Sequence, residues 1–165
     1  MPRASSATLS PTLALWAELT DEELALLGLS EGVAGGLERW LELVEHSVAA
    51  PSAASAHLVL AHARAAAPQA WTLVLEPLAS ERSDLIGPFL ADRTSALLEG
   101  TTLEGSVWSV DPALVLPGAP MVSAGNDPIL TEERLGTRTD WHLNLDPARS
   151  SLQRSPDWPI LLVNL

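Results

Sequence analysis

Hydrophobic residues recur at helical spacing in two segments near the start of the chain. In "LTDEELALLG", Thr20 is a predicted helix N-cap, Glu23 completes a capping box three residues later, and Gly28 is a natural C-terminal stop. A second helix is predicted after Ser30, because apolar residues there are spaced by three and four positions. They are Val33, Leu37, Trp40, Leu41 and Val44. Residues 1–50 are therefore predicted to be helical.

Two apolar runs of strand length come next. They are "AHLVLAH" at 56–62 and "AWTLVLEP" at 70–77, and their unbroken hydrophobicity is typical of buried strands. The order helix, strand, short crossover and strand indicates a parallel sheet with helices on its faces. Residues 78–105 lack a periodic pattern, and we expect a long ordered loop there with one helical turn at 94–98.

The last third of the chain predicts an antiparallel hairpin. Segments 128–133 and 139–145 are strand-like and are joined by "RLGTR", with Gly136 at its centre. Shorter strands are predicted upstream, at "SVWSV" and "APMVSAG". Alternation in "DWHLNL" gives the last strand two faces, with Trp141, Leu143 and Leu145 on one and His142 and Asn144 on the other.

The final segment, "SPDWPILLVNL", has the form of a helix start. Ser155 and Asp157 are the predicted caps of this helix, and Trp158 and Trp141 are predicted to anchor its packing. Several glycines lie in the predicted loops and are expected to shape them. They are Gly87, Gly100, Gly105, Gly118 and Gly125.

The composition is that of one folded, acidic domain. With 165 residues, of which 47% are hydrophobic and 18% charged, the chain is long and apolar enough to bury a core. The formal net charge is -12, and all nine cationic residues are arginines. An acidic surface repels phosphate backbones and anionic lipids, which argues against nucleic acid and charged membranes as partners. No apolar run in the sequence has the length of a membrane-spanning helix.

Familiar catalytic and metal-binding motifs are missing from the sequence. Cysteine is absent, which removes disulfides, thiolate metal ligands and cysteine nucleophiles together. The HExxH zinc motif, the GxSxG nucleophile elbow and the phosphate-binding glycine loops do not occur either. We therefore expect no cofactor and no metal.

Histidines are the first of two remaining groups of candidates. His57 and His62 bracket a predicted strand and face opposite ways, so they cannot easily share a metal. A triad of Ser123, Asp127 and His142 can be assembled on paper, as in any serine-rich chain. Solvated or capped histidines, His46 included, are the favoured interpretation.

Carboxylate pairs are the second group. Glu132 and Glu133 are neighbours on a predicted strand and so face opposite ways, and Asp84 and Asp92 lie in the predicted loop. The calcium-loop pattern DxDxDG is missing. A solvated acidic surface is the favoured interpretation of these pairs.

Four segments of the chain, taken in order, resemble one protein family. They are "SDLIGPFLADR", "LLEGTTLEGSVWSVDP", "LPGAPMVSAGNDPIL" and "WHLNLDPARSSLQRSPDWPILLVNL". Together they resemble the C-terminal part of the soluble region of large bacterial BatA-type membrane proteins, related to the aerotolerance-operon family. The resemblance covers residues 56–165 and is strongest from Asp146 to Leu165. Such proteins typically carry membrane helices, a von Willebrand factor A domain and a domain similar to class I glutamine amidotransferases.

The resemblance implies a fold, a location and a context. The fold would be α/β, a flavodoxin-like or amidotransferase-like three-layer sandwich with a mostly parallel sheet and an antiparallel C-terminal hairpin. The location would be the extracytoplasmic part of a bacterial inner-membrane protein, of which this chain is a piece whose last helix continues past Leu165. The amidotransferase cysteine and the DxSxS adhesion motif are missing here, so the scaffold is expected without its chemistry.

We therefore expect residues 1–165 to form a single non-enzymatic domain, a scaffold or protein-interaction module of a BatA-type membrane-associated assembly. Its partners would be other protein domains of that assembly. One alternative is a small acidic hydrolase or sugar-binding enzyme with a carboxylate site near Glu76, Asp84 and Asp127, at the strand ends where open α/β sheets bind ligands. Another is an acidic protein that binds a basic partner through its charge.

Overall fold

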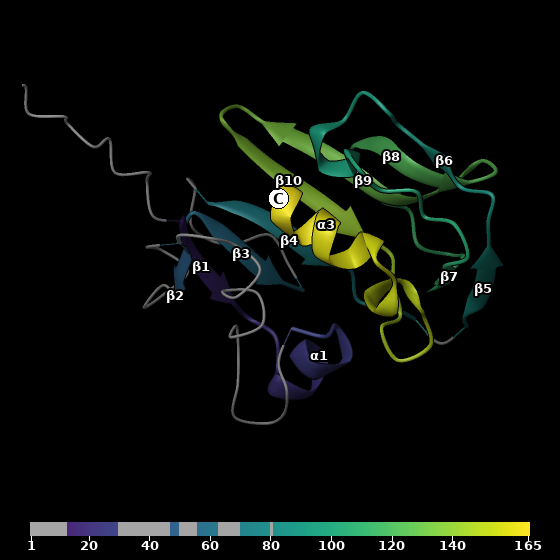
Figure 1. The fold of residues 1–165 in the computed structure, drawn as a ribbon, viewed down its shortest axis with the longest axis horizontal. Helices are drawn as coiled ribbons and strands as arrows, with labels where there is room; N and C mark the ends of the chain where they lie inside the picture. The colour runs from purple at the N-terminus through teal and green to yellow at the C-terminus, as the bar shows by residue number, and fades with distance from the viewer. Residues whose placement is uncertain (1–12, 30–46, 50–55, 63–69, 80) are drawn as a thin grey trace, which may run out of the picture.

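The chain folds around one large β-sheet in a computed structural model that describes residues 13–29, 47–49, 56–62, 70–79 and 81–165 (Figure 1). The sheet has eight strands in the order β2-β1-β3-β4-β10-β9-β8-β6, and β5 and β7 form a separate two-stranded sheet. The strands are β1 (Leu13–Ala17), β2 (Ser47–Ala49), β3 (Leu58–Ala61), β4 (Trp71–Leu75), β5 (Ser83–Ile86), β6 (Leu90–Ala91), β7 (Val107–Val110), β8 (Ala119–Ala124), β9 (Asp127–Leu135) and β10 (Arg138–Leu143). The helices are α1 (Asp21–Leu26) and α3 (Asp157–Asn164), with 3-10 turns η2 (Ala96–Leu98) and η3 (Leu152–Arg154). The predicted α/β class is confirmed.

One half of the sheet is parallel. β1 pairs with β2 and β3, β3 pairs with β4, and β4 pairs with β10, all in the same direction. Every side chain of β3 is buried, and so are those of β4 from Thr72 to Leu75. Burial on both faces explains why these strands form unbroken apolar runs rather than alternating ones. The strands predicted at 56–62 and 70–77 are confirmed, with narrower bounds.

The other half of the sheet is antiparallel. β9 and β10 form the predicted hairpin, in which Leu143 pairs with Leu130 and Arg138 with Leu135. β8 pairs with β9, and the two-residue strand β6 pairs with β8 at the edge of the sheet. Gly136 lies in the hairpin turn with a φ of 69°, a conformation that glycine adopts without steric strain. β9 is longer than the pattern indicated, because Asp127 pairs with β8 at its start and Arg134 and Leu135 pair with β10 at its end.

Helix α1 begins with the predicted capping box. The side-chain oxygen of Thr20 accepts a hydrogen bond from the N–H of Glu23 at 3.3 Å, and the Glu23 carboxylate accepts one from the N–H of Thr20 at 2.8 Å. Gly28 follows the last turn with a φ of 70°, as expected for a helix stop. This short helix is confirmed. The second predicted helix, around 33–44, lies outside the described residues.

Helix α3 starts where expected but is not capped by the predicted residues. Its N-cap is Pro156, which makes no side-chain capping bond, and the hydroxyl of Ser155 donates to a carbonyl of η3 at 2.8 Å. The Asp157 carboxylate accepts hydrogen bonds from the backbone N–H groups of Thr102 and Leu103, at 2.9 and 2.8 Å. The capping prediction was wrong because a distant turn supplies donors for Asp157, and a local pattern cannot show them.

Two further expectations need correction. Residues 1–50 are not only helical, because β1 and β2 lie among them. Residues 78–105 were expected as a loop but contain β5 and β6, which pair with β7 and β8. Both strands are short, so they are recognisable by their pairing rather than by periodicity. The helical turn expected at 94–98 is η2.

Helix α3 covers one hydrophobic core. Figure 1 shows it lying across β4 and β10. Trp158 of α3 is 5% exposed and belongs to the same buried cluster as Leu73 of β4 and Leu143 of β10. Trp141 is also 5% exposed and belongs to this cluster. Both tryptophans are therefore core residues, as predicted.

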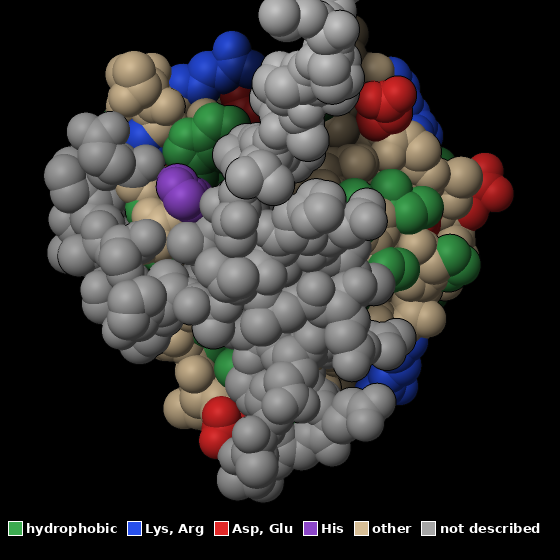
Figure 2. All heavy atoms as spheres, turned by 60° about the vertical axis from the view of Figure 1, so that its left-hand side comes forward, with side chains coloured by type: hydrophobic (Ala, Val, Ile, Leu, Met, Phe, Trp, Pro, Cys, Tyr) green, Lys and Arg blue, Asp and Glu red, His purple; other side chains and the backbone are tan. Residues whose placement is uncertain are grey.

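The surface of the described residues carries both charged and apolar side chains. In Figure 2, acidic and basic side chains lie around the margin of the view, and hydrophobic ones are also open to solvent. The exposed large hydrophobic side chains include Ile86, Leu90 and Val115. In the part of the chain that the structure describes, no helix combines the length and the apolar character needed to cross a membrane.

Candidate functional site

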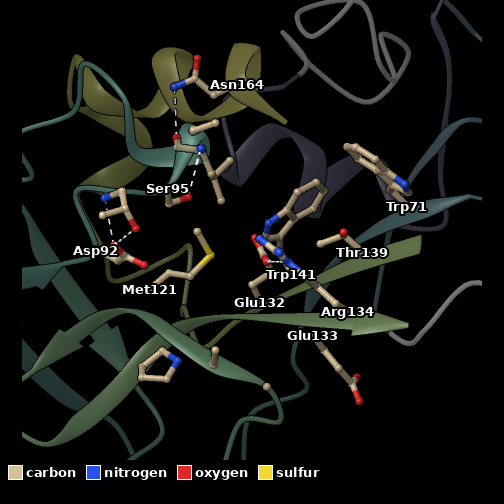
Figure 3. A pocket seen from close by; sticks show the side chains of 16 residues that line it. Trp71, Asp92, Ser95, Met121, Glu132, Glu133, Arg134, Thr139, Trp141 and Asn164 are labelled. Carbon is tan, nitrogen blue, oxygen red and sulfur yellow. Dashed lines mark hydrogen bonds and ion pairs between the residues drawn. The ribbon is translucent and has the colours of Figure 1, made fainter. Parts of the chain in front are cut away.

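A recess of about 930 Å³ opens beside the last turn of α3 (Figure 3). Its apolar wall contains Trp71, Trp141 and Met121, and its polar rim contains Asp92, Glu132 and Arg134. The remaining lining residues come mainly from η2, from the start of β8 and from the last turn of α3. They are Thr94, Ser95, Ala96, Leu97, Gly118, Ala119, Pro120, Glu133, Thr139 and Asn164. We call this hollow the tryptophan recess.

Two tryptophans from neighbouring strands meet in the recess. Trp71 begins β4 and Trp141 lies in β10, and their rings pack edge to face with centroids 5.5 Å apart. The indole N–H of Trp71 donates to the carbonyl of Thr137 at 3.3 Å, yet Trp71 remains 41% exposed. Trp141 is buried, and its indole N–H has no hydrogen-bond partner. Trp71 is therefore the ring that a ligand can contact, while Trp141 supports it from below.

The rim of the recess carries more negative than positive charge. Glu132 is hydrogen-bonded to Arg134, two residues along the same strand. The Oδ1 atom of Asp92 accepts hydrogen bonds from the hydroxyl and the backbone N–H of Thr94, at 2.6 and 2.9 Å. These hydrogen bonds lower the pKa of Asp92, so its carboxylate is charged at neutral pH. The side chain of Glu133 points away from the recess (Figure 3).

Two residues fix the shape of the recess. Asn164, at the end of α3, donates from Nδ2 to the carbonyls of Leu97 and Glu99 at 3.1 and 2.9 Å, which ties α3 to η2. Gly118 has a φ of 88°, and a Cβ atom there would come within 2.4 Å of the Glu132 carbonyl oxygen. The backbone of Glu132 and Glu133 thus leaves no room for any residue other than glycine at this position.

A buried ionic cluster lies on the opposite face of the same strands. Because side chains alternate along β10, Arg138, Asp140 and His142 face away from the side of Trp141. Arg138 donates from Nε and Nη2 to the two carboxylate oxygens of Asp140, at 2.8 and 2.7 Å, and Asp140 is fully buried. This hydrogen bonding outweighs the effect of burial and raises the pKa of Arg138. Arg138 and Asp140 thus form a buried ion pair joined by two hydrogen bonds.

His142 lies between two glutamates in this cluster. Its Nδ1 is 2.6 Å from Oε1 of Glu76, and its Nε2 is 3.4 Å from Oε2 of Glu133. Glu76 follows β4 and Glu133 belongs to β9, so His142 on β10 joins three neighbouring strands. His142 is 5% exposed, and its Nε2 has no hydrogen-bond partner. Possible ligand atoms of Glu133, Asp140 and His142 all lie within 4.8 Å of one another.

The three carboxylates expected at the strand ends have separate environments. Glu76 contacts His142, whereas Asp84 in β5 pairs with Arg149 at 3.0 Å. Asp127 begins β9 and is exposed. The triad of Ser123, Asp127 and His142 considered from the sequence is not formed by these contacts either, because the partner of His142 Nδ1 is Glu76 rather than Asp127.

Of the other histidines that the structure describes, His57 and His62, neither lines the recess or belongs to the group of possible metal ligands. His62 is 2.5 Å from Oε1 of Glu23, and its Nδ1 is 2.9 Å from the carbonyl oxygen of Leu75. It is thus a structural link between α1 and the parallel strands. His57 is exposed, and His46 lies outside the described residues.

The sequence interpretation missed both sites, although part of the signal was present. Alternation placed His142 and Asn144 on one face, and the same alternation would have added Asp140 to it. Folding the hairpin about Gly136 would then have set Glu133 opposite Asp140. Glu76 could not be found this way, since it lies 66 residues before His142. The same holds for Trp71, which reaches Trp141 only because β4 and β10 are neighbours.

The chain matches no protein-family model, no curated protein and no solved structure, so the geometry of these sites carries the functional argument.

Proposed function

We propose that this chain is a non-enzymatic protein-interaction module whose tryptophan recess receives a basic segment of a partner protein. The observation that carries the proposal is Trp71, a large aromatic side chain that stays 41% exposed in the wall of the recess. Tryptophan is enriched among the residues that dominate protein interfaces. The contacts with Thr137 and Trp141 hold the ring in place beforehand, which reduces the entropy lost on binding.

Charge selects the class of partner. The rim contains Asp92 and Glu132 with Arg134 as a single cation, and the formal net charge of the chain is -12. A lysine or arginine of a partner can lie over the face of Trp71, because the aromatic ring attracts a cation. The surrounding negative charge also accelerates the encounter with a basic segment. An acidic segment would meet repulsion at the same rim.

The lining of the recess supports binding rather than catalysis. Its described residues include neither histidine nor cysteine, the side chains that most often act as general base and as activated nucleophile. The hydroxyl of Ser95 accepts a hydrogen bond from the N–H of Leu97, and the hydroxyl of Thr94 donates one to the carboxylate of Asp92. Both hydroxyls therefore serve the local structure of the η2 turn.

A BatA-type membrane-associated assembly is the setting of this proposal. It is supported by the resemblance of residues 56–165 to the soluble region of such proteins. The finer fold assignment is supported by the order β2-β1-β3-β4-β10 in the parallel half, which is the strand order of a flavodoxin-like sheet. In that setting the domain is extracytoplasmic, and its partners are other domains of the assembly.

Selection from a random peptide library tests the proposed function, with the full chain as bait and its Trp71→Ala variant as counter-bait. We expect the enriched peptides to carry lysine or arginine beside apolar residues. Fluorescence polarisation should show binding weakened by roughly tenfold or more in Trp71→Ala and by added salt. Ile86→Ala removes an exposed apolar side chain in β5 and is the matched control, which should bind like the unchanged protein.

Two results would contradict the proposed function. One is a set of enriched peptides without basic residues. The other is equal affinity for the unchanged protein and for Trp71→Ala, since a partner that ignores Trp71 does not use the recess.

A further inference from the structure

We propose that His142, Glu133 and Asp140 form a zinc-binding site on the face of the sheet opposite the tryptophan recess. The inference is independent of the proposed function, because it depends on a different group of residues. Their ligand atoms already lie within 4.8 Å of one another, on two strands that are hydrogen-bonded in register. Zinc binds histidine nitrogen and carboxylate oxygen, and open zinc sites use three protein ligands with water in the fourth position.

The orientation of His142 is the first argument. Oε1 of Glu76 lies 2.6 Å from Nδ1 and so fixes the ring and favours the tautomer with the proton on Nδ1. Nε2 then presents a lone pair toward Glu133. This nitrogen is buried and has no hydrogen-bond partner, although buried polar atoms are normally paired. A carboxylate on the outer nitrogen of a ligating histidine is the usual second-shell contact of a zinc site.

The separation between Nε2 of His142 and Oε2 of Glu133 is the second argument. These atoms are 3.4 Å apart but do not form a hydrogen bond. Two ligand atoms each about 2.0–2.1 Å from a tetrahedral zinc ion are separated by roughly 3.3–3.4 Å. The observed distance therefore fits His142 and Glu133 as two ligands of one zinc ion, and the Asp140 oxygen, within 4.8 Å of both atoms, would move closer when the ion binds.

The carboxylates around His142 are the third argument. Glu76, Glu133 and Asp140 bring three carboxylates to the cluster, and Arg138 brings one guanidinium. Carboxylate oxygens beside an imidazole nitrogen are donors that zinc binds. Both oxygens of Asp140 accept from Arg138, but each carboxylate oxygen has a second lone pair that can bind a metal.

The donor set selects zinc over the hard divalent cations. Calcium and magnesium prefer six or more oxygen ligands, whereas imidazole nitrogen with few carboxylates suits zinc. Glu133 gives the ion a path from solvent, because its side chain is 26% exposed while that of His142 is 6% exposed.

Zinc titration of the full chain, free of any histidine tag, tests the inference by calorimetry. We expect one zinc per chain in the unchanged protein and a weakening of roughly 10- to 100-fold in Glu76→Gln, which alters only the outer contact. His142→Ala should abolish stoichiometric binding. His57→Ala removes an exposed histidine elsewhere and should leave binding unchanged.

Cobalt provides a readout that a merely structural role would not give. Co²⁺ in the site should produce the intense visible absorption of a tetrahedral ion, and Glu133→Gln, at a partly exposed position, should reduce it even if His142→Ala fails to fold. Absence of saturable zinc binding by the unchanged protein would overturn the inference. So would stoichiometric binding that persists in both Glu133→Gln and folded His142→Ala.

Discussion

Trp158 donates its indole N–H to the backbone carbonyl of Leu27 at 2.7 Å, which ties the last helix of the chain to the end of its first. The two residues are 131 positions apart, and both are buried. Leu27 directly follows α1, where backbone carbonyls lack partners within the helix. One side chain of α3 therefore supplies a donor for a carbonyl at the C-terminal end of α1.

Trp158→Phe should destabilise the protein by about 1–3 kcal/mol, because it leaves the Leu27 carbonyl buried without a partner. Urea unfolding followed by circular dichroism measures the loss. Trp71→Phe removes a comparable N–H from an exposed ring and should change the free energy of unfolding by less than about 0.5 kcal/mol. Equal losses in both variants would show that the hydrogen bond from Trp158 to Leu27 does not contribute more to the free energy of unfolding than the exposed one from Trp71.

Gly118→Ala should destabilise the protein by about 3 kcal/mol or more, since the added Cβ would lie 2.4 Å from the Glu132 carbonyl oxygen. Gly125→Ala is the matched control. Gly125 also has a positive φ, of 61°, but nothing lies within 4 Å of its would-be Cβ, so a loss of only about 1 kcal/mol is expected. Thermal unfolding of the two variants distinguishes the effect of the steric contact from that of the positive φ alone. Similar melting temperatures would contradict the role given to the contact with the Glu132 backbone.

Asp157→Ala should cost about 3 kcal/mol, because it removes the acceptor of two backbone N–H groups, those of Thr102 and Leu103. Asp157→Asn retains one oxygen at nearly the same position and should lose roughly half as much. Chemical denaturation gives both values. Equal losses in Asp157→Asn and Asp157→Ala would mean that the retained oxygen contributes nothing and would contradict the role given to the two hydrogen bonds.

The link between His62 and Glu23 predicts a pH dependence of stability. Burial alone would lower the pKa of His62, but its contacts with the Leu75 carbonyl and with Glu23 outweigh burial and raise it. Burial alone would raise the pKa of Glu23, but hydrogen bonds from Thr20 and the contact with His62 lower it. The raised histidine pKa stabilises the fold below about pH 6.5, and this contribution is lost as the pH rises through the folded-state value. The lowered glutamate pKa stabilises it above about pH 4.3, and that contribution is lost as the pH falls.

Glu23→Gln should therefore reduce stability most between about pH 4.5 and 6.5 and little above pH 8, while glutamine retains the capping box. The side chain of His62 is 41% exposed, so screening should hold the effect below about 1 kcal/mol. Melting temperatures across this range, at low and high salt, measure it. Glu22→Gln, in the same helical turn but exposed, should leave the profile unchanged.

Local patterns predicted the parts of the fold whose causes are local. The capping box of α1 depends on Thr20 and Glu23, three residues apart, and the hairpin depends on alternation on either side of Gly136. Asp157 was assigned to a cap because its nearest donors in sequence are those of its own helix, whereas its actual partners are 54 and 55 residues away. Strands β5 and β6 were not predicted for the same reason, since they are defined by their pairing with strands that are distant in the sequence.

The candidate sites show the same division. Trp141, His142 and Asp140 could be placed on their faces of β10 from the sequence, because strand alternation has a fixed period. Trp71, in β4, and Glu76, directly after it, could not be assigned to those faces, because β4 becomes a neighbour of β10 only in the folded sheet. In each site, the residues of the hairpin could thus be placed from the sequence, whereas the residue contributed from β4 or directly after it could not.

The outermost strands of the sheet are its shortest, three residues in β2 and two in β6. An edge strand offers unpaired N–H and carbonyl groups onto which another chain can add a strand, and long, flat edges promote aggregation. Here Asp92 and Arg93 follow β6 directly, so two charged residues flank this short edge strand. A sheet with an apolar residue such as Leu90 exposed at its margin is in this way protected from growing by edge-to-edge polymerisation.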